Sequence, residues 1–454
     1  AAISRSIDPV AMNAYFNYFY VPEPRTIFEK IRKLGPGQTL VCQNGKITIT
    51  QYWNVEYGDY LHESEEACAE KLEYLLEDAV KIRMHSDVPL GIFLSGGIDS
   101  SSIVSIASRA TGLPLKTFSV YGGEGIFNEL PYARIAAKAA QAEHTELSVK
   151  AEDVKSLLPR LIGFIDEPFA DSSIIPTYYI SKMSRQKVTV ALSGEGGDEV
   201  FGGYSRYKKN ALIGFFRDHS LLRGLIRSSA KAASVTPGLF PALSKLALLN
   251  RLCTMEDDER YEMMMHVFSE PLKASVFSAV VANGQQEFVV RDNYAASTAS
   301  ERLNRALYAD LKTYLPGDLL VKVDRMSMSN ALEVRAPFLD HRIIEFVSKM
   351  PPQFKIKGGL TKYILRKSMR GKVPDRILNR RDKRGFSVPI GKWFCGGFGD
   401  FAQEILLDAQ ALRRGIFLRQ GVHDMFKLHR AGKRDYGHQI WTLLVFELWA
   451  RQYL

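Results

Sequence analysis

The sequence predicts an α/β fold: a parallel sheet with helices on both faces, followed by a mainly helical C-terminal part and preceded by a short β-rich segment. Three observations support this. Between residues 64 and 192, short apolar runs alternate with stretches of helical periodicity. These short runs are nearly continuously apolar, as in strands buried on both faces. Beyond residue 205 the periodicity is mainly helical to the C-terminus.

The N-terminal segment, residues 1–57, has a different pattern from the rest of the chain. It contains the β-type runs Thr39–Val41 and Lys46–Gln51, with glycine-containing turn sequences between and before them. We interpret this segment as the end of a β-rich domain. Residues 58–454 are then predicted to form a second domain.

Helices and strands alternate in that second domain. The first helix, Ser64 to Met84, has Ser64 as a suitable N-cap, and Glu65 and Glu66 place negative charge where the helix dipole favours it. After it we expect a strand at 89–94, a helix at 99–110, a strand at 115–120, a helix opened by Asn128, and strands at 145–149 and 187–192. Strands separated by helices imply a parallel sheet, whose ligands bind beyond the carboxyl ends of the strands.

Length and composition fit a globular protein of two or three domains, with 454 residues, 46% apolar and 24% charged. No apolar run approaches the roughly 20 residues needed to cross a bilayer, so we expect no membrane partner. The start lacks both Met and a secretory signal, and we expect a cytoplasmic protein with an incomplete N-terminus. The four cysteines show no CxxC spacing, which argues against zinc and disulfides.

The net charge of +10 is concentrated in one segment. Thirteen Lys or Arg residues and only two acidic residues lie between Pro351 and Lys392. Because no aromatic recognition motif is interleaved with these charges, the segment indicates a clamp for a small polyanion rather than a nucleic-acid surface. We expect no nucleic-acid partner.

The most informative motif is Leu94-Ser95-Gly96-Gly97-Ile98-Asp99-Ser100-Ser101, placed where the first buried strand ends and a helix begins. Two glycines let the backbone turn tightly and approach a ligand. The new helix presents its N–H groups and positive dipole end, and the serines add hydroxyl donors. This combination predicts an anion site suited to phosphate rather than a purely structural turn.

A second glycine-rich turn, Ser193 to Tyr204, follows the apolar run Val188–Leu192. We expect the two turns to lie side by side at one edge of the sheet. In that arrangement Asp198 and Asp99 approach each other from different strand ends and share a Mg²⁺ ion that bridges phosphate oxygens.

No Walker-type loop and no dinucleotide fingerprint occurs in the sequence. The first motif instead resembles the pyrophosphate-binding loop of N-type ATP pyrophosphatases, which cleave ATP between the α- and β-phosphates. From about residue 58 to the C-terminus, the chain resembles the synthetase domain of glutamine-dependent asparagine synthetases, which implies an adenine-nucleotide alpha-hydrolase-like fold. Besides the two turns, the matching segments are Asp166–Pro168, Tyr314–Leu320, Val323–Met328, Leu332–Asp340 and Lys383–Phe386.

This resemblance implies roles for individual residues. Glu195 matches the family's essential glutamate, which helps ammonia attack the acyl-adenylate by accepting a proton or by positioning. Lys383 matches a lysine that stabilises charge on the phosphates during adenylation. The implied ATP contacts are Leu94 and Val120 near the adenine, Ser193 and Gly194, and, around the pyrophosphate, Ser95, Gly96, Gly97, Asp99 and Ser100.

For several charged residues the sequence allows two interpretations. The basic run around Lys383 also suits a solvated face, although Gly385 and Phe386 complete the family pattern and favour the catalytic interpretation. For Lys362, Arg366 and Arg370, at i, i+4 spacing, a structural or electrostatic role stands beside direct contact. We expect internal ion pairs for a further set of charges: Asp324, Arg325, Glu333, Arg335 and Asp340.

Two departures from the family pattern bear on function. Family members begin with a glutaminase domain whose nucleophile is an N-terminal cysteine, whereas this chain starts with Ala1, and residues 1–57 resemble only the last strands of that domain. We hypothesise a truncated form that uses at most free ammonia, with a separate glutaminase as another source. Typical members also carry an arginine near the aspartate, but Asp166–Pro176 contains none.

We therefore expect an enzyme that uses Mg²⁺ and ATP to convert a carboxylate into its adenylate, from which ammonia displaces AMP. Aspartate is the default acceptor, and other carboxylates, such as those of cell-surface sugars, or an intramolecular amide stay open. A non-catalytic nucleotide-binding paralogue is the alternative outside enzymes, although charges converging on one cleft argue against it. The oligomeric state is left open, with a homodimer as one arrangement.

Overall fold

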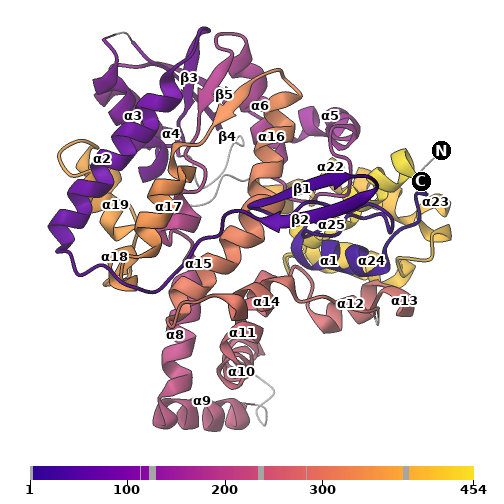
Figure 1. Cartoon of the computed structure of the whole chain (residues 1–454). Helices are drawn as coiled ribbons and strands as arrows, with labels where there is room; N and C mark the ends of the chain where they lie inside the picture. Colours follow the sequence, from indigo (N-terminus) through magenta and orange to yellow (C-terminus); the bar gives the residue numbers. More distant parts are fainter. Residues whose placement is uncertain (1–3, 113, 122–128, 234–239, 283, 382–387) are drawn as a thin grey trace.

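A five-stranded parallel sheet forms the centre of the protein (Figure 1). The computed structural model describes residues 4–112, 114–121, 129–233, 240–282, 284–381 and 388–454. The strands, in the spatial order β5-β4-β3-β6-β7, are β3 (Leu90–Phe93), β4 (Lys116–Tyr121), β5 (Glu143–Ser148), β6 (Val190–Leu192) and β7 (Glu333–Arg335). The predicted parallel sheet is thus confirmed.

The strand order reverses between β3 and β6. The chain first adds β4 and β5 on one side of β3 and then returns to place β6 on the other side, so that Ile92 lies between Thr117 and Leu192. Ligands of open α/β sheets bind beyond the carboxyl ends of the strands at such a reversal. The two glycine-rich turns follow the two strands that meet there.

Helices cover both faces of the sheet, as predicted (Figure 1). On one face α3 (Ile98–Ala110) and α4 (Leu130–Ala139) pack on the strands, with α2 (Glu65–Met84) against α3. On the other face lie α6 (Ile174–Arg185) and α16 (Val321–Met328). Strands covered on both faces are rich in apolar residues, which is why β3 and the apolar positions of β4, Phe118 and Val120, are recognisable from the sequence.

The edge strand β7 was missed by the sequence analysis. Val190 pairs with Glu333, and Leu192 pairs with Arg335, in a parallel ladder of three residues. Two of the three residues of β7 are charged, and their side chains bond to each other 2.6 Å apart at the border of the sheet. So short and polar a strand carries no periodic signal, because its pairing depends on β6 rather than on its own residues.

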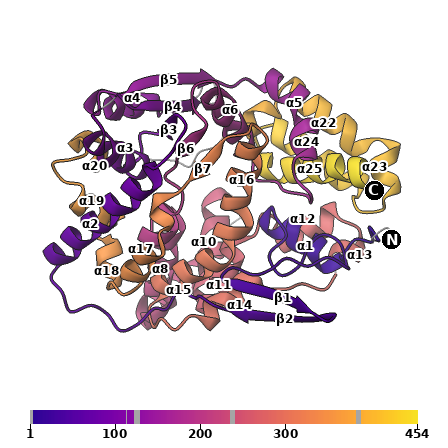
Figure 2. The same ribbon diagram turned by 45° about the horizontal axis from the view of Figure 1, so that its top comes forward.

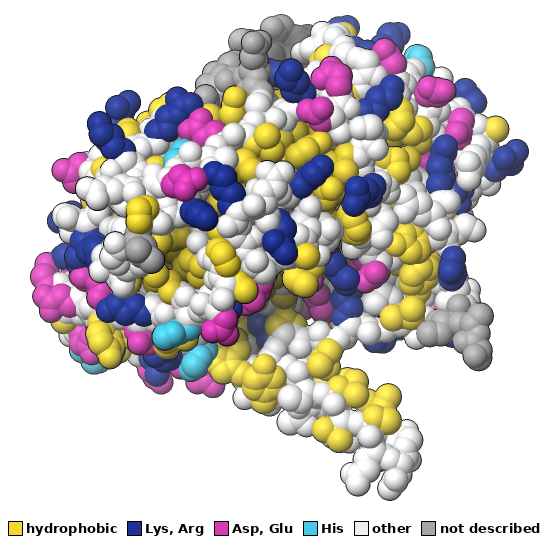
Figure 3. Space-filling view, turned by 90° about the horizontal axis from the view of Figure 1, so that it is seen from above, with side chains coloured by type: hydrophobic (Ala, Val, Ile, Leu, Met, Phe, Trp, Pro, Cys, Tyr) yellow, Lys and Arg dark blue, Asp and Glu magenta, His cyan; other side chains and the backbone are white. Residues whose placement is uncertain are grey.

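The two β-type runs predicted in the N-terminal segment are strands, β1 (Gln38–Gln43) and β2 (Lys46–Gln51), and they pair as an antiparallel hairpin. Asn44 and Gly45 both have positive φ, 51° and 75°, as a tight two-residue turn requires. Leu40 pairs with Ile49, and both side chains are exposed. The hairpin stands out from the body as the narrow projection with hydrophobic side chains at the lower edge of Figure 3.

The same segment also holds a helix that the sequence analysis did not predict, α1 (Pro9–Tyr18). Asp8 caps it by accepting a hydrogen bond of 2.9 Å from Val10 N. The ring of Phe16 lies 5.1 Å from that of Phe446 on the last helix, α25 (Gly437–Tyr453). The helix therefore shares the main hydrophobic core. The domain boundary at residue 57 stays a prediction.

The rest of the chain is mainly helical, as predicted. Helices α22 to α25 gather beside α5 and α1 (Figures 1 and 2). No helix in the described ranges is long and apolar enough to cross a membrane. The remaining elements are α5 (Ala151–Gly163), α7 (Gly197–Phe201), α8 (Ser205–Asp218), α9 (Ser220–Ala233), α10 (Phe240–Thr254), α11 (Asp257–Met265), α12 (Glu270–Val276), α13 (Ala279–Ala282), α14 (Val289–Ala296), α15 (Arg302–Lys312), the π-helix η1 (Leu315–Leu320), the 3₁₀-helix η2 (Pro337–Leu339), α17 (His341–Ser348), α18 (Pro352–Lys355), β8 (Ile356–Lys357), β9 (Leu360–Thr361), α19 (Tyr363–Ser368), α20 (Asp375–Leu378), α21 (Ile390–Trp393), α22 (Gly397–Leu407), α23 (Ala409–Arg413) and α24 (Arg419–Arg430).

Candidate active site

The first glycine-rich loop joins β3 to α3. Gly96 has a φ of 72°, and a Cβ atom there would lie 2.4 Å from the backbone nitrogen of Ala133 in α4. Only glycine fits this position. Gly97 is the N-cap of α3, and because it has no side chain it leaves the first-turn N–H groups of the helix facing outward. This is the helix-terminus geometry that binds phosphate.

Serine hydroxyls line the same loop. The Ser95 backbone N–H donates a hydrogen bond of 3.2 Å to Ser100 Oγ, and the two serine Oγ atoms also lie 3.2 Å apart. Across the reversal, the Oγ of Ser193 is buried and makes no hydrogen bond to the described part of the chain. A buried hydroxyl without a partner is costly in the absence of a ligand, so these groups suit an anion with several acceptor oxygens.

The second glycine-rich loop contacts the first directly. It follows β6, and a Cβ atom at Gly194 would lie 3.1 Å from the Cβ of Asp99, while one at Gly197 would lie 2.8 Å from the Asp99 carboxyl carbon. The prediction that the two turns lie side by side is confirmed. The lack of side chains at these glycines is what lets the loops meet.

Lys362 ties the two loops together. Its Nζ donates to both carboxylate oxygens of Asp99, at 2.7 and 2.6 Å, and lies 2.6 Å from Asp198 Oδ1. The lysine side chain is only 3% exposed. Its backbone has a φ of 54° at the start of α19, a left-handed conformation that costs about 1–3 kcal/mol in a residue other than glycine.

The structure separates the roles of the three basic residues at i, i+4 spacing. Lys362 pairs with the two aspartates, whereas Arg366 donates to the backbone carbonyls of Thr361 and Leu378 and braces the surrounding turns. Arg370 is exposed. The sequence could not single out Lys362, because 263 residues separate it from Asp99.

The predicted Mg²⁺ ligands, Asp99 and Asp198, do come together. Carboxylate oxygens, completed by phosphate oxygens, are a donor set that suits Mg²⁺. Here both carboxylates are bonded to Lys362, and the described residues contain no group of three or more side chains that would hold a metal by themselves. The fit to Mg²⁺ therefore depends on the nucleotide as a co-ligand, and the metal role stays a prediction.

Leu94 and Val120, the residues predicted near the adenine, lie at the carboxyl ends of adjacent strands. Both are buried, and Leu94 N donates a hydrogen bond of 2.8 Å to the carbonyl of Phe118. This position is apolar and next to the first loop. It suits an adenine ring, although their contact with ATP stays a prediction.

The two residues predicted to be catalytic are Glu195 and Lys383. Glu195 is partly buried in the second loop. Burial, followed by the negative charges of Asp198 and Glu195, raises the pKa of Glu199 to about 8. Lys383 lies outside the described residues. The basic segment before it does reach the first loop, since Arg380 Nη1 lies 3.5 Å from the carbonyl of Gly96 and its guanidinium pairs with Glu129 at 2.6 Å.

Four of the five charges assigned to internal ion pairs are paired, but only the Asp340 carboxylate is buried. Arg325 pairs with Asp166 at 2.6 Å, and Asp340 pairs with Arg83 at 3.0 Å. Glu333 and Arg335 pair with each other, and Asp324 is exposed. These charges therefore serve the framework.

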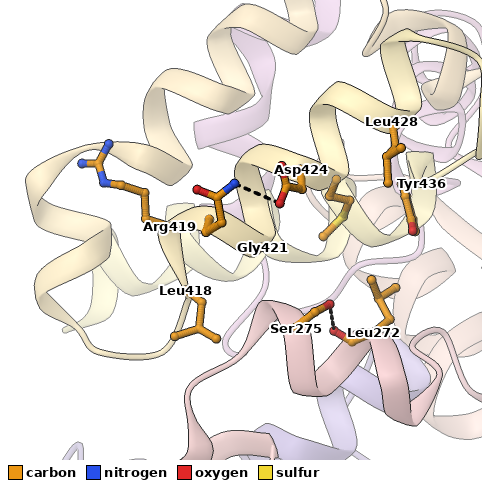
Figure 4. Close-up of a pocket in the computed structure, with 10 residues that line it drawn as sticks. Leu272, Ser275, Leu418, Arg419, Gly421, Asp424, Leu428 and Tyr436 are labelled. Carbon is orange, nitrogen blue, oxygen red and sulfur yellow. Dashed lines mark hydrogen bonds between the residues drawn. The ribbon is translucent and has the colours of Figure 1, made fainter.

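A separate hollow of about 440 Å³ lies between α12 and α24 (Figure 4). Gln420 and Asp424 hydrogen-bond each other across 3.0 Å at its wall, and most of the other lining side chains are apolar. None of its lining residues belongs to the loops after β3 and β6. The convergent polar groups predicted from sequence are at the sheet reversal instead.

Fold and loops together define a class: an α/β protein with an anion-binding type of helix terminus at the strand reversal of a parallel sheet. Residues 71–451 match the family model described as asparagine synthase. The chain belongs to the asparagine synthase family, and this membership supports an ATP-dependent amide ligase of the glutamine-hydrolysing asparagine synthetase type.

Similarity to individual proteins agrees with this family membership. The chain is 35% identical over 444 residues to asparagine synthetase [glutamine-hydrolyzing] 1 of Bacillus subtilis, covering 98% of this chain and 68% of that one. A putative asparagine synthetase of Mycobacterium tuberculosis H37Rv is 33% identical over 448 residues, with 98% and 67% covered. Amidase chry2 of Gibberella zeae is 26% identical over 439 residues, with 88% and 64% covered. This chain spans about two thirds of the length of these relatives.

Replacing Gly96 with alanine should weaken ATP binding by about tenfold or more, because the added Cβ forces the loop away from Ala133 N. Gly45→Ala is the matched control: Gly45 also has positive φ, but no atom lies within 4 Å of the added Cβ. Titration calorimetry with a non-hydrolysable ATP analogue should show unchanged affinity for the control. Equal affinities in both variants would contradict the assignment of this loop to phosphate.

Replacing Lys362 with methionine should lower the free energy of unfolding by about 3–5 kcal/mol and abolish ATP binding, because two facing carboxylates lose the cation between them. Lys357→Met, five residues away, removes a lysine that is 50% exposed and pairs with Glu65. That control should change stability by about 1 kcal/mol or less. Urea unfolding measures both variants, and similar losses would argue against Lys362 as the link between the loops.

Proposed function

We propose that this chain converts the side-chain carboxylate of aspartate into its adenylate and then forms asparagine. In the first step a carboxylate oxygen attacks the α-phosphorus of ATP and pyrophosphate leaves. In the second step ammonia attacks the activated carbonyl carbon, AMP leaves, and the surplus proton on nitrogen is taken up by a base. The observation that carries the proposal is the contact of the two glycine-rich loops at the strand reversal, locked by Lys362.

The first loop supports adenylation. Ser95, Gly96, Gly97 and Ser100 offer N–H and hydroxyl donors to the phosphates, and the end of α3 adds its positive dipole. When bound with the nucleotide, Mg²⁺ would neutralise phosphate charge, and Asp99 and Asp198 are the residues that would hold it. We assign Lys383 to the charge that develops on the leaving pyrophosphate.

The second loop supports amide formation. We assign Ser193 and Gly194 to the nucleotide, because Gly194 packs against Asp99 and Ser100 of the first loop, and Glu195 follows them in the chain. A carboxylate there can accept the proton that ammonia loses as the carbon–nitrogen bond forms. Related proteins are named as glutamine-hydrolysing, and we assign this chain the synthetase half of that reaction, with ammonia arriving free or from a glutaminase.

A different carboxylate acceptor is the second candidate, and one observation favours it. The segment Asp166–Pro176 has no arginine to bind the α-carboxylate of aspartate, and two of its acidic side chains, Asp166 and Glu167, are already paired with Arg325 and Lys33. One relative is named as an amidase rather than as an asparagine synthetase. These observations favour a carboxylate other than aspartate as the alternative acceptor.

Pyrophosphate release from MgATP, ammonium and aspartate, with each component left out in turn, tests the proposal. Release that requires aspartate and yields asparagine is the expected result. No release with aspartate, but release with another carboxylate from a panel, would replace aspartate as the acceptor. ATP binding without release on any carboxylate would favour a nucleotide-binding paralogue and contradict the proposal.

Glu195→Gln should lower amide formation by roughly 10²–10⁴-fold while the fold is kept, because the amide side chain cannot accept a proton. Glu333→Gln is the control, since Glu333 begins β7 opposite Val190, at the other end of the strands from the loops, and its half-exposed carboxylate pairs with Nε of Arg335. Asparagine formation measured by amino-acid analysis should be unchanged in the control. An unchanged rate in Glu195→Gln would refute its role as base.

A further inference from the structure

Arg380 is a buried arginine beside the first glycine-rich loop. It follows α20, and its side chain is only 5% exposed. Two nitrogens of its guanidinium have different partners: Nη1 donates to the carbonyl of Gly96 at 3.5 Å, and Nη2 donates to Glu129 Oε1 at 2.6 Å. Burying a guanidinium is costly unless it is paired and hydrogen-bonded, and here both conditions are met.

Glu129 and Tyr132 hold this guanidinium in place. Both belong to the start of α4, where Glu129 is the N-cap and Tyr132 lies in the first turn. The guanidinium carbon lies 4.1 Å from the centre of the Tyr132 ring, within the range of a cation–π contact. The backbone of Tyr132 also abuts the loop, since a Cβ atom at Gly96 would lie 2.6 Å from its carbonyl carbon. Arg380 is therefore fixed by the same helix that the loop packs against.

The carbonyl that Arg380 contacts belongs to the peptide between Gly96 and Gly97. This peptide is trans, so its C=O and N–H groups point in opposite directions. The carbonyl faces Arg380, whereas the Gly97 N–H donates to Ser95 Oγ at 3.3 Å. Ser95 Oγ in turn lies 3.2 Å from Ser100 Oγ, among the hydroxyls assigned to phosphate. The N–H therefore faces the side of the loop assigned to phosphate, and the carbonyl faces away from it.

A peptide between two glycines turns over easily, because glycine has no Cβ and reaches positive and negative φ at similar cost. Gly96 has a φ of 72° here, and Gly97 has a φ of −80°. If this peptide turned over, its carbonyl oxygen would face the phosphates, and an attractive donor would be replaced by a repulsive acceptor. A donor that holds the carbonyl from the other side of the loop prevents this.

We propose that Arg380 is a positioning residue for phosphate binding: its guanidinium, held by Glu129 and Tyr132, keeps the Gly96–Gly97 peptide turned with its N–H toward the phosphates. This inference rests on the proposed function, since it takes the first loop as the site of the β- and γ-phosphates of ATP. Arg380 acts through the loop rather than by contact with the nucleotide.

The test compares two ligands of the full chain, a non-hydrolysable ATP analogue and AMP, which lacks the β- and γ-phosphates. Arg380→Met should weaken binding of the ATP analogue by about tenfold or more, because one N–H donor to a charged phosphate is lost. Binding of AMP should stay within about twofold of wild type. Titration calorimetry measures both dissociation constants, and their ratio separates positioning of the loop from a general loss of structure, which would weaken both ligands.

Arg376→Met is the matched control. Arg376 lies four residues earlier, and its guanidinium carbon is 5.8 Å from the centre of the same Tyr132 ring, but Arg376 is exposed. This variant removes an arginine from the same segment without touching the hold on Gly96. It should bind the ATP analogue and AMP as tightly as the wild type.

Arg380→Lys tests geometry against charge. A lysine keeps the positive charge but replaces the planar fork with a single nitrogen, so Gly96 and Glu129 lose their two separate donors. Affinity for the ATP analogue should still fall by about threefold or more. If Arg380→Met does not fold, as judged by circular dichroism, the double variant Arg380→Met, Glu129→Gln takes its place, because it also removes the carboxylate charge that Arg380 balances.

Several results would overturn the inference. Equal losses of affinity for the ATP analogue and AMP in Arg380→Met would show a purely structural role. Unchanged affinity for the ATP analogue in Arg380→Met would deny any role in phosphate binding, and unchanged affinity in Arg380→Lys would show that the charge acts without the hold on the peptide. Wild-type protein that binds the ATP analogue no more tightly than AMP would instead refute the assignment of this loop to phosphate in the proposed function.

Discussion

The ammonium of Lys362 between Asp99 and Asp198 is the interaction on which the rest of the site depends. Each aspartate belongs to a different glycine-rich loop, and like charges brought this close in a buried place repel strongly unless a cation lies between them. The glycines permit the approach sterically, and the lysine permits it electrostatically. The left-handed backbone of Lys362 shows that the surrounding structure holds the lysine in place despite local strain.

The sequence alone predicts those strands and loops that are encoded in short-range patterns of residues. Strands β3 and β6 are apolar because they are covered on both faces, and the loop after β3 combines glycine, serine and aspartate within eight residues. By contrast, β7 depends on β6 for its pairing, and α1 depends on α25 for its burial. Lys362 looks like any other basic residue until the fold brings it to its carboxylates. The sequence analysis therefore misses those features that only tertiary contacts define.

Lys362 also sets the electrostatics of the site. Around it two carboxylates are balanced by one shared cation beside N–H donors, which suits polyanionic phosphates. A second buried lysine, Lys322 on α16, pairs at 3.4 Å with Asp171, which lies just before α6. This ion pair links two helices on the same face of the sheet.

The distance in sequence between Asp99 and Lys362, 263 residues, has a consequence for folding. Contacts between segments so far apart form late, because a long loop must close before they contribute any stability. A fragment must span residues 99–362 to contain both partners, so a ligand that binds this site binds only a chain in which these distant segments have come together. At a concentration a hundred times its dissociation constant, such a ligand stabilises the folded chain by about 2.7 kcal/mol, and it protects distant surface segments from proteolysis as effectively as the loops it touches wherever cleavage requires global unfolding.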